Sequence, residues 1–452
     1  DTVVTTDSTG TALVSGDGTV IDIFTHLSAI PQVPVVLFGD SRIAQCAADS
    51  GTSKSLCNRG FFFHLQNSSK GSFDLKNVAG VGGDTLALGL ARFDNAVGGP
   101  LFGNGAAPGV SPYLPASAKG VLITWLGAND INTGVTLAAM QTTAQQIMAK
   151  AKALNCLHIW VNEPPAGSAQ GWTAAQNAKI VAWNRWLLSQ SVVVIDAYSL
   201  AINPTSATML PTANMMNDNA VHPSNLLGKL IGEAIWAKIS ALIQTPNILP
   251  SSVTQVISYN SAIPQYQVLP LLQTNVAASG STFGSLSGTM PTGATFVGVG
   301  SATVVSDATT AAASGFGNAW QADITFASAS DVIVMNLPTS AANFTGGETI
   351  FAACNVELTG PAGAALTTAD NVKVCKIQLD TTDAAAVSAV RTGGLENSGD
   401  VAQSGNINGV LRTPPVTLSA GVPTTVRAKI NIQAAGAGGC RVKISRAAIW
   451  AA

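Results

Sequence analysis

The stretch VPVVLFGDSRIAQC, residues 33–46, begins with six residues of apolar character and then turns abruptly to Gly39, Asp40 and Ser41. A short apolar run bounded by turn residues is typical of a buried β-strand. Asp and Ser are also common helix N-caps, so the stretch is consistent with an ordinary strand followed by a capped helix. It is also consistent with a nucleophilic serine presented at the carboxyl end of that strand. The rest of the chain has to decide between the two interpretations.

Strand-like runs alternate with helix-length segments in the first half of the chain, as expected for a parallel sheet flanked by helices. Helical apolar spacing occurs in residues 136–154, 173–190 and 225–243. We therefore expect an α/β domain with a flavodoxin-like, doubly wound parallel sheet, in which ligands lie beyond the carboxyl ends of the strands. The five strand candidates are residues 33–38, 73–80, 119–127, 156–162 and 191–197.

The sequence changes character after QTPNILPSSV, residues 244–253. From there on, short Val, Ile, Thr and Phe runs are separated by Gly, Ser, Asn and Pro without an amphipathic helix, which predicts a β-sandwich. Near the beginning, a Gly-Asp-Gly turn between short strands predicts a hairpin arm. The expected organisation is an arm over residues 1–30, the α/β domain over 31–245, a linker over 246–253 and the sandwich over 254–452.

Composition limits the classes of function. The chain has 452 residues, a length that favours two domains. Its net charge is −2 and its 22 Lys and Arg form no basic stripe, which argues against nucleic-acid binding. Charged residues make up 10%, against about 25% in typical soluble domains, a feature shared with many extracellular and virion proteins. No apolar window reaches the roughly 18 residues of a membrane span, and the start at Asp1 suggests a processed or trimmed product.

The six cysteines include no CxxC pair, and no histidines stand at metal-ligand spacing. We therefore expect no metal site. Cys46 and Cys57 flank a short loop beside the Gly-Asp-Ser and could close a disulfide in an exported protein, or stay free. The segment AGVGGDT begins like a dinucleotide loop but lacks the third Gly and follows the second strand, so we expect no nucleotide cofactor either.

If Ser41 is a nucleophile, it needs a base and oxyanion donors from loops after other strands. The second strand is followed by NVAGVGGDT (77–85), a Gly-rich turn that can bring a backbone N–H close to a substrate. The third strand ends in LGAND (126–130), where Asn129 could aim its amide at the site. The loop after the fifth strand carries NDNAVHPSN (217–225), with His222 just ahead of a long helix.

These motifs resemble the SGNH, or GDSL-type, serine hydrolases over roughly residues 31–243. That family contributes a Ser, a Gly, an Asn and a His from four sequence blocks in this order. The matching positions are Ser41 in FGDSR, Gly83 in VGGDT, Asn129 in GAND and His222 in VHPSN. Each motif is weak alone, but four in the right order, each after a predicted strand, favour the nucleophile interpretation of Ser41.

The resemblance implies a serine esterase. Ser41 would attack an ester carbonyl after giving its proton to His222. The N–H groups of Ser41 and Gly83, with the amide of Asn129, would hold the oxyanion, and water would then release the acyl group. Because losing one oxyanion donor costs about 10²–10³ in rate, Asn129 is expected to matter almost as much as the nucleophile.

One position departs from the family pattern. The family usually has an Asp three residues before the His, but that position is Asn219 here, and the acid, Asp218, is four residues before. We assign the orienting role to Asp218, reaching His222 through a bulged loop. Asn219 or a backbone carbonyl could instead orient the His in a dyad, or the site could be weakened or inactive, since an Asp-to-Asn change costs about 10⁴ in the serine-protease template.

Other polar residues have simpler interpretations. His26, His64 and His158 have no spaced partner and are expected to be structural. Asp84 and Asp130 each follow a motif residue and are expected to brace their loops by hydrogen bonds. Arg42, directly after Ser41, is expected to be solvated rather than to contact an anionic substrate.

The second half narrows the expected substrate. Residues 268–305 loosely resemble the start of jelly-roll modules that accompany glycan-active and phage-tail proteins. We therefore expect an esterase that removes O-acetyl groups from carbohydrate, namely a bacterial surface polysaccharide. The protein would be secreted or part of a phage tail. We expect it to form a homo-oligomer, which would be a trimer in a phage tail. The alternatives are a lipid esterase or thioesterase, and a non-catalytic adhesin or virion structural protein on the same fold.

Overall fold

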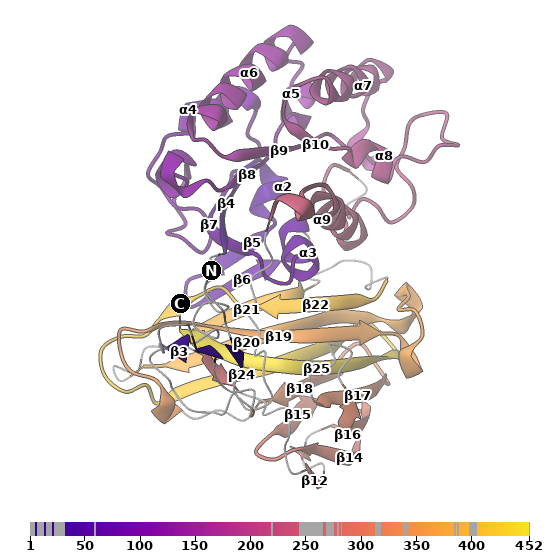
Figure 1. The fold of residues 1–452 in the computed structure, drawn as a ribbon. Coiled ribbons are helices and arrows are strands. Elements are labelled where there is room, and N and C mark those ends of the chain that lie inside the picture. Colours follow the sequence, from indigo (N-terminus) through magenta and orange to yellow (C-terminus); the bar gives the residue numbers. More distant parts are fainter. Residues whose placement is uncertain are drawn as a thin grey trace.

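The computed structural model describes most of the chain, and Figure 1 shows its fold. The described residues are 32–57, 60–217, 220–243, 283–311, 318–337, 341–383, 386, 388–396 and 405–451, with the short segments 5–6, 13–14, 20–21, 265–267, 275–277 and 280–281.

The first half contains the expected parallel sheet. Five strands lie in the order β10-β9-β8-β4-β7, and all neighbours are parallel. In β4, Val35 and Leu37 point to one face while Val36 and Phe38 point to the other, and both faces are buried. The fold-class prediction is therefore confirmed. The strands are β4 (Val33–Gly39), β7 (Phe73–Gly80), β8 (Val121–Trp125), β9 (Leu157–Val161) and β10 (Val193–Ile195).

Helices cover both faces of this sheet (Figure 1). Helices α3 (Phe61–Ser68) and α9 (Asn225–Ile239) pack on the face of Val35. The opposite face is covered by α4 (Leu86–Arg92), α6 (Leu137–Ala153) and α7 (Ala174–Leu188). Three short helices begin right after strands β4, β8 and β10, and these are α2 (Ser41–Ala44), α5 (Ala128–Asn132) and α8 (Ala197–Ala201).

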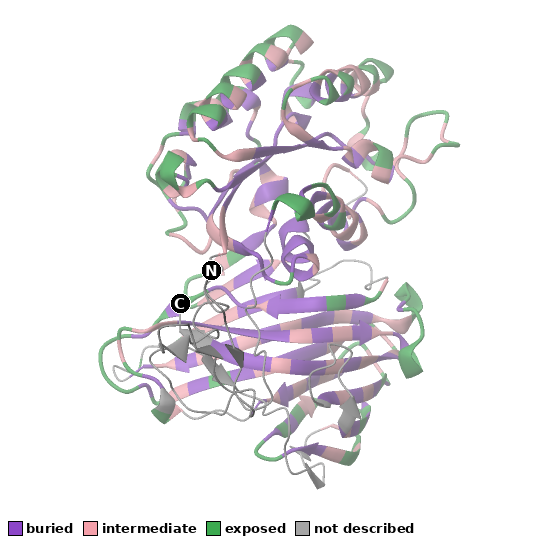
Figure 2. Ribbon diagram, in the orientation of Figure 1, coloured by how far each residue is buried: buried purple, intermediate pink, exposed green. Residues whose placement is uncertain are grey.

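The second half is built from two further sheets, as the sequence predicts. One has nine strands and the other eight, and they share a core that includes Trp320, Ile377 and Val442. The long strands alternate buried and less buried residues, whereas the central parallel strands are buried throughout (Figure 2). The longest are β19 (Thr349–Thr359), β20 (Val372–Thr382), β24 (Thr425–Ala434) and β25 (Gly438–Ala451).

The shorter strands complete these two sheets. They are β11 (Gln265–Gln267), β12 (Asn275–Ala277), β13 (Gly280–Ser281), β14 (Ser285–Pro291), β15 (Thr295–Val299), β16 (Thr303–Ala311), β17 (Asn318–Phe326), β18 (Val332–Asn336), β21 (Ser388–Glu396), β22 (Ile407–Arg412) and β23 (Val416–Thr417).

A hairpin from the first half belongs to the eight-stranded sheet. Strands β5 (Ala47–Ser50) and β6 (Ser53–Cys57) pair antiparallel directly after α2, and β6 pairs in parallel with β21. Phe63 of α3 also enters the core between the two large sheets. The sequence analysis assigned residues 47–57 to the α/β domain alone, so this pairing is a feature that it did not anticipate. The predicted linker lies outside the described residues.

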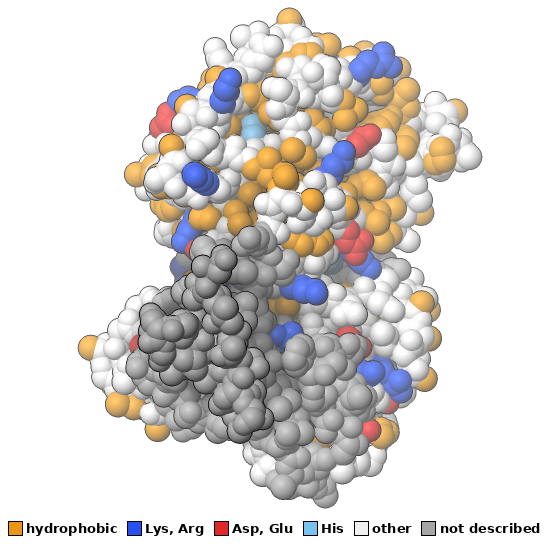
Figure 3. Space-filling model, viewed as in Figure 1, with side chains coloured by type: hydrophobic (Ala, Val, Ile, Leu, Met, Phe, Trp, Pro, Cys, Tyr) orange, Lys and Arg blue, Asp and Glu red, His pale blue; other side chains and the backbone are white. Residues whose placement is uncertain are grey.

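The N-terminal segment has three short strands, β1 (Thr5–Thr6), β2 (Leu13–Val14) and β3 (Val20–Ile21), which pair antiparallel in chain order. No helix in the described part of the chain combines the length and apolar character of a membrane span. On the face shown in Figure 3, charged side chains lie scattered between neutral ones, as the low charge content leads one to expect.

Cys46 and Cys57 are not joined by a disulfide. The hairpin brings their backbones together, and the Cys57 N–H donates to the Cys46 carbonyl at 2.9 Å. Cys46 is buried, and this burial raises the pKa of its thiol to about 12. Of the two possibilities that the sequence left open, the structure therefore has the one without a disulfide.

Phe63 tests whether the two halves unfold together. Its side chain is 3% exposed in the core of the β-rich half, although it belongs to a helix of the first half. We expect Phe63→Ala to cost about 3–5 kcal/mol of stability and to lower a single melting transition measured by calorimetry. Leu188→Ala on α7, where the side chain is 53% exposed, is the control and should change little. Two separate transitions, with only one shifted, would contradict the shared core.

Candidate active site

Ser41 stands at the first turn after β4, an interior strand of the parallel sheet. The Asp40 side chain caps α2 by accepting the Arg42 backbone N–H at 3.0 Å. Two glycines allow this turn to pack closely. A Cβ on Gly39 would lie 2.2 Å from the Trp125 carbonyl oxygen, and one on Gly80 would lie 2.2 Å from the Ala44 nitrogen. The turn is thus held against the neighbouring strands, with Ser41 only partly buried.

The imidazole of His222 meets the Ser41 hydroxyl. Their Nε2 and Oγ atoms lie 3.0 Å apart, although the residues are 181 positions apart in the chain. The histidine lies in the loop before α9, where the Asn217 N–H donates to its carbonyl at 2.9 Å. A hydroxyl within hydrogen-bond reach of an imidazole is the arrangement that activates a serine nucleophile.

The two predicted oxyanion loops lie at the same edge of the sheet. Gly82 approaches Ser41, since a Cβ at Gly82 would be 3.9 Å from that of Ser41. Gly83 has a φ of +83° that favours glycine, and apart from its chain neighbours no atom lies within 4 Å of the position that a Cβ would take. Asn129 donates one amide hydrogen to the Asp84 carbonyl at 2.8 Å, and an amide NH₂ has a second hydrogen to donate. The oxyanion roles of Gly83 and Asn129 remain predictions.

Asp84 and Asp130 brace these loops, as predicted. Asp84 accepts from Arg92 at 2.6 Å, and Arg92 in turn donates to the Gly39 carbonyl at 2.7 Å, just before the nucleophile turn. Asp130 accepts the Leu86 N–H at 2.9 Å. Burial raises the pKa of Asp130 to about 6. The loops after the first three strands are therefore tied to one another by buried polar contacts.

Arg42 is buried rather than solvated, which corrects the sequence-based expectation. Its guanidinium is 1% exposed and donates to Asp40 at 2.9 and 2.6 Å. It also pairs with both carboxylate oxygens of Glu163 and lies 4.7 Å from the centre of the Trp125 ring. Burial alone would lower the pKa of Arg42, but the two carboxylates more than offset this and raise it. Arg42 is thus a fixed cation beneath the nucleophile turn.

Glu163 is a site-supporting residue that the sequence analysis did not single out. It directly follows β9 and Asn162. Its backbone is fixed by Asn184 of α7: the Glu163 N–H donates to Asn184 Oδ1 at 3.0 Å, and Asn184 Nδ2 donates to the Glu163 carbonyl at 2.7 Å. The loop NEPPAG (162–167) is buried, so it is a rigid turn at this edge. One signal in the sequence could have identified Glu163: it is a charged residue directly after an apolar strand, in a chain with few charges.

The residue that orients His222 is not settled by these contacts. Asp218 and Asn219 both lie outside the described residues, so the assignment of Asp218 remains a prediction. Within the described part of the chain, no cluster of three or more His, Cys, Asp or Glu is placed to hold a metal ion. His158 is buried and structural, as expected. It bonds Thr124 at 2.9 Å, and burial lowers its pKa to about 3.

A family match covers the part of the chain that contains the nucleophile turn. Residues 37–226 match the model of the GDSL-like Lipase/Acylhydrolase family. No curated protein matches the chain.

Several solved structures resemble the first half of the chain. A lipase/acylhydrolase from Enterococcus faecalis is 17% identical, with 47% of this chain and 98% of that chain covered and a TM-score of 0.35. A GDSL-like lipase from Bacteroides thetaiotaomicron is 14% identical, with 48% of this chain and 96% of that chain covered and a TM-score of 0.34. An acetyl xylan esterase is 15% identical, with 46% of this chain and 100% of that chain covered and a TM-score of 0.34.

The family match covers the same part of the chain as the parallel sheet and its helices. The match begins within β4 and ends at the start of α9, so it includes Ser41, Gly83, Asn129 and His222. It leaves the β-rich half outside. Residues 37–226 therefore form a domain of the GDSL-like lipase/acylhydrolase family.

Proposed function

We propose that the protein is a serine esterase that removes O-acetyl groups from carbohydrate. The observation that carries the proposal is the 3.0 Å contact between Ser41 Oγ and His222 Nε2 at the carboxyl edge of a GDSL-type sheet. The attached β-rich half and the low charge of the chain favour a polymer outside the cell, such as a bacterial surface polysaccharide.

The reaction would follow from this geometry in two stages. Ser41 Oγ attacks the acetyl carbonyl carbon while its proton passes to His222 Nε2. The tetrahedral intermediate collapses, and the sugar oxygen leaves with the proton from His222, so that an acetyl-serine remains. Water then attacks the acetyl-serine as His222 takes a proton, and collapse returns that proton to Ser41 and releases acetate.

The oxyanion of each intermediate needs donors that are in place beforehand. In our proposal, these are the N–H groups of Ser41 and Gly83 and the free hydrogen of the Asn129 amide. The bond from Asn129 to the Asp84 carbonyl fixes the plane of that amide. A donor held in this way loses little entropy when charge develops on the substrate oxygen.

One observation favours a second candidate, an esterase or thioesterase for longer acyl chains. A cavity of about 420 Å³ next to the loop after β9 is lined in part by Trp172, Met209 and Leu210. The Gly167 N–H in its wall donates to the Ala220 carbonyl at 2.7 Å, two residues before His222. An apolar wall this close to the histidine loop would suit a hydrocarbon chain.

Ester hydrolysis by Ser41 is the first prediction of this proposal. The wild type should release 4-nitrophenol from the acetyl ester faster than from the octanoyl ester, and Ser41→Ala should abolish turnover with an unchanged melting temperature. Ser330→Ala, in the β-rich half, is the matched control. Faster octanoate turnover would favour the second candidate, and a wild type inactive on every ester would favour a non-catalytic protein.

Asn129 provides a test of the oxyanion site. We expect Asn129→Ala to lower kcat on 4-nitrophenyl acetate about 10²–10³-fold, because one preorganised donor is lost. Asn132→Ala, three residues further along the same helix, removes an exposed amide of the same size and should leave kcat nearly unchanged. An effect of Asn129→Ala on KM alone would exclude the oxyanion role.

Arg42 tests the support of the nucleophile turn. Arg42→Gln leaves Asp40 and Glu163 buried without their cation, and we expect a loss of about 3–5 kcal/mol at neutral pH. Burial already raises the pKa of Glu163, and loss of Arg42 raises it further above the unfolded value. Stability therefore falls as pH rises through the folded-state pKa, so the deficit should be smallest in acid.

Denaturation midpoints from pH 4 to pH 8 measure this trend. Arg185→Gln, at an exposed arginine of α7, is the control and should stay within about 0.5 kcal/mol of the wild type. A deficit for Arg42→Gln that does not change with pH would show that lost packing, rather than the buried charge, causes it.

A further inference from the structure

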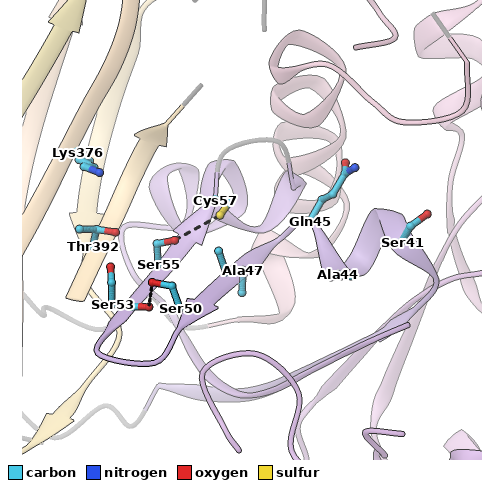
Figure 4. A pocket seen from close by; sticks show the side chains of 11 residues that line it. Ser41, Ala44, Gln45, Ala47, Ser50, Ser53, Ser55, Cys57, Lys376 and Thr392 are labelled. Atoms are coloured by element: carbon cyan, nitrogen blue, oxygen red, sulfur yellow. Dashed lines mark hydrogen bonds between the residues drawn. The ribbon is translucent and has the colours of Figure 1, made fainter. Parts of the chain in front are cut away.

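A groove of about 570 Å³ lies beside Ser41 and has walls from both halves of the chain. Figure 4 shows its lining side chains extending from Ser41 and Gln45 at α2, past the β5–β6 hairpin, to Thr392 and Lys376 on the eight-stranded sheet. Its volume is in the range of about 300–1,000 Å³ that small-ligand sites occupy. The nucleophile therefore stands at one end of a cavity large enough to hold more than an acetyl group.

The walls of the groove are held by continuous strand pairing. Ser55 of β6 lies opposite Thr392 of β21, and β21 lies between β6 and β20. On β20, Lys376 is opposite Gly394, which has no side chain to cover it. Since α2 leads directly into β5, the distance from Ser41 to this wall is set by a short, hydrogen-bonded path.

The groove is lined by small side chains, most of which carry a polar group. Its described lining consists of serine and threonine hydroxyls, alanine methyls, one thiol, one amide and one ammonium group. This lining contains no aromatic residue, no apolar side chain larger than alanine and no carboxylate. It therefore offers hydrogen-bond partners to a ligand rich in hydroxyl groups.

Gln45 gives a specific reason to expect a hydroxyl-bearing ligand. Its Oε1 atom is buried and accepts no hydrogen bond from any described residue. A buried acceptor without a donor costs about 1–3 kcal/mol. Because Gln45 also lines the groove, a small rotation of its side chain would let this oxygen accept a hydrogen bond from a sugar hydroxyl, which a hydrocarbon chain could not donate.

We propose that this groove binds the carbohydrate chain that adjoins the acetylated sugar, and that Lys376 binds a carboxylate of an acidic sugar. This inference rests on the proposed esterase function and specifies its substrate class. The ester carbonyl lies at Ser41, the neighbouring hydroxyls meet Gln45 and the hairpin serines, and the acidic group lies on β20. The β-rich half is thereby part of the substrate site.

The charge part of the proposal is tested with two acetylated polymers. Initial rates of acetate release are measured on O-acetylated polygalacturonate, which is acidic, and on O-acetylated xylan, which is neutral. Lys376→Gln should lower kcat/KM about tenfold on the acidic polymer and little on the neutral one, since one charge-assisted contact is lost. Lys238→Gln, at an exposed lysine of α9, is the control. Equal losses on both polymers would overturn the carboxylate role of Lys376.

The position of the groove is tested by filling it. Ser53→Trp places an indole at its wall and should reduce acetate release from both polymers at least tenfold, a larger loss than it causes with 4-nitrophenyl acetate, which does not fill the groove. Ser287→Trp puts the same group on exposed β14, away from the groove, and should have no effect. Wild-type rates on the polymers for Ser53→Trp would overturn the groove as the carbohydrate site.

Failure of the proposed carbohydrate esterase function can be distinguished from failure of the groove proposal. A wild type that hydrolyses 4-nitrophenyl acetate but neither polymer is not a carbohydrate esterase of the proposed kind. The groove is then tested by binding alone, with inactive Ser41→Ala protein and unacetylated polygalacturonate in affinity electrophoresis. Retardation that Lys376→Gln or Ser53→Trp abolishes would support the groove, and the absence of retardation would overturn it.

Discussion

Burial of both faces of the five-stranded sheet is the constraint on which the rest of the first half depends. In β4, alternate residues pack under helices on opposite sides, so no polar side chain can project from the middle of the strand without losing its hydrogen bonds to water. Polar side chains within the strands therefore need a partner there, as His158 and Thr124 have in each other, and groups that must meet a substrate lie at the strand ends. At the carboxyl edge, Ser41, Gly83, Asn129 and His222 converge because parallel strands all end there.

A buried charge cluster of Asp40, Arg42 and Glu163 lies directly beyond two of these strand ends. Three ionised groups beneath the nucleophile turn are expensive to bury, and bidentate pairing on both sides of one guanidinium offsets that cost. Lysine could not replace Arg42 here, because a single ammonium cannot meet two carboxylates in two planar pairs. The cluster joins the turn after β4 to the loop after β9. It thus fixes the orientation of Ser41 from below while leaving its hydroxyl exposed to substrate.

The sequence was sufficient for the class of each half, because periodicity and turn residues are local signals. The four motif positions came from the resemblance to the GDSL-type hydrolases, and of these the structure joins Ser41 and His222 by a hydrogen bond. The five predicted strands match the observed ones closely. Arg42 could not be placed from the sequence, since its burial depends on Glu163, 121 residues away. The same applies to β6, because nothing in its own residues indicates that its partner is β21, more than 300 residues further on. The predicted role of Asp218 remains beyond what the structure describes.

The pairing of β6 with β21 changes how the second half should be understood. A module joined only by a linker can bring a polymer near an active site, but its effect is limited by the range of positions that the linker allows. Here a hydrogen-bonded hairpin begins three residues after α2 ends, and the core of the β-rich half includes Phe63 from the α/β half. A ligand bound on β20 and β21 is consequently held at a fixed position relative to Ser41. Binding energy from a distant sugar can then be used to orient the ester at the nucleophile, as efficient catalysis requires.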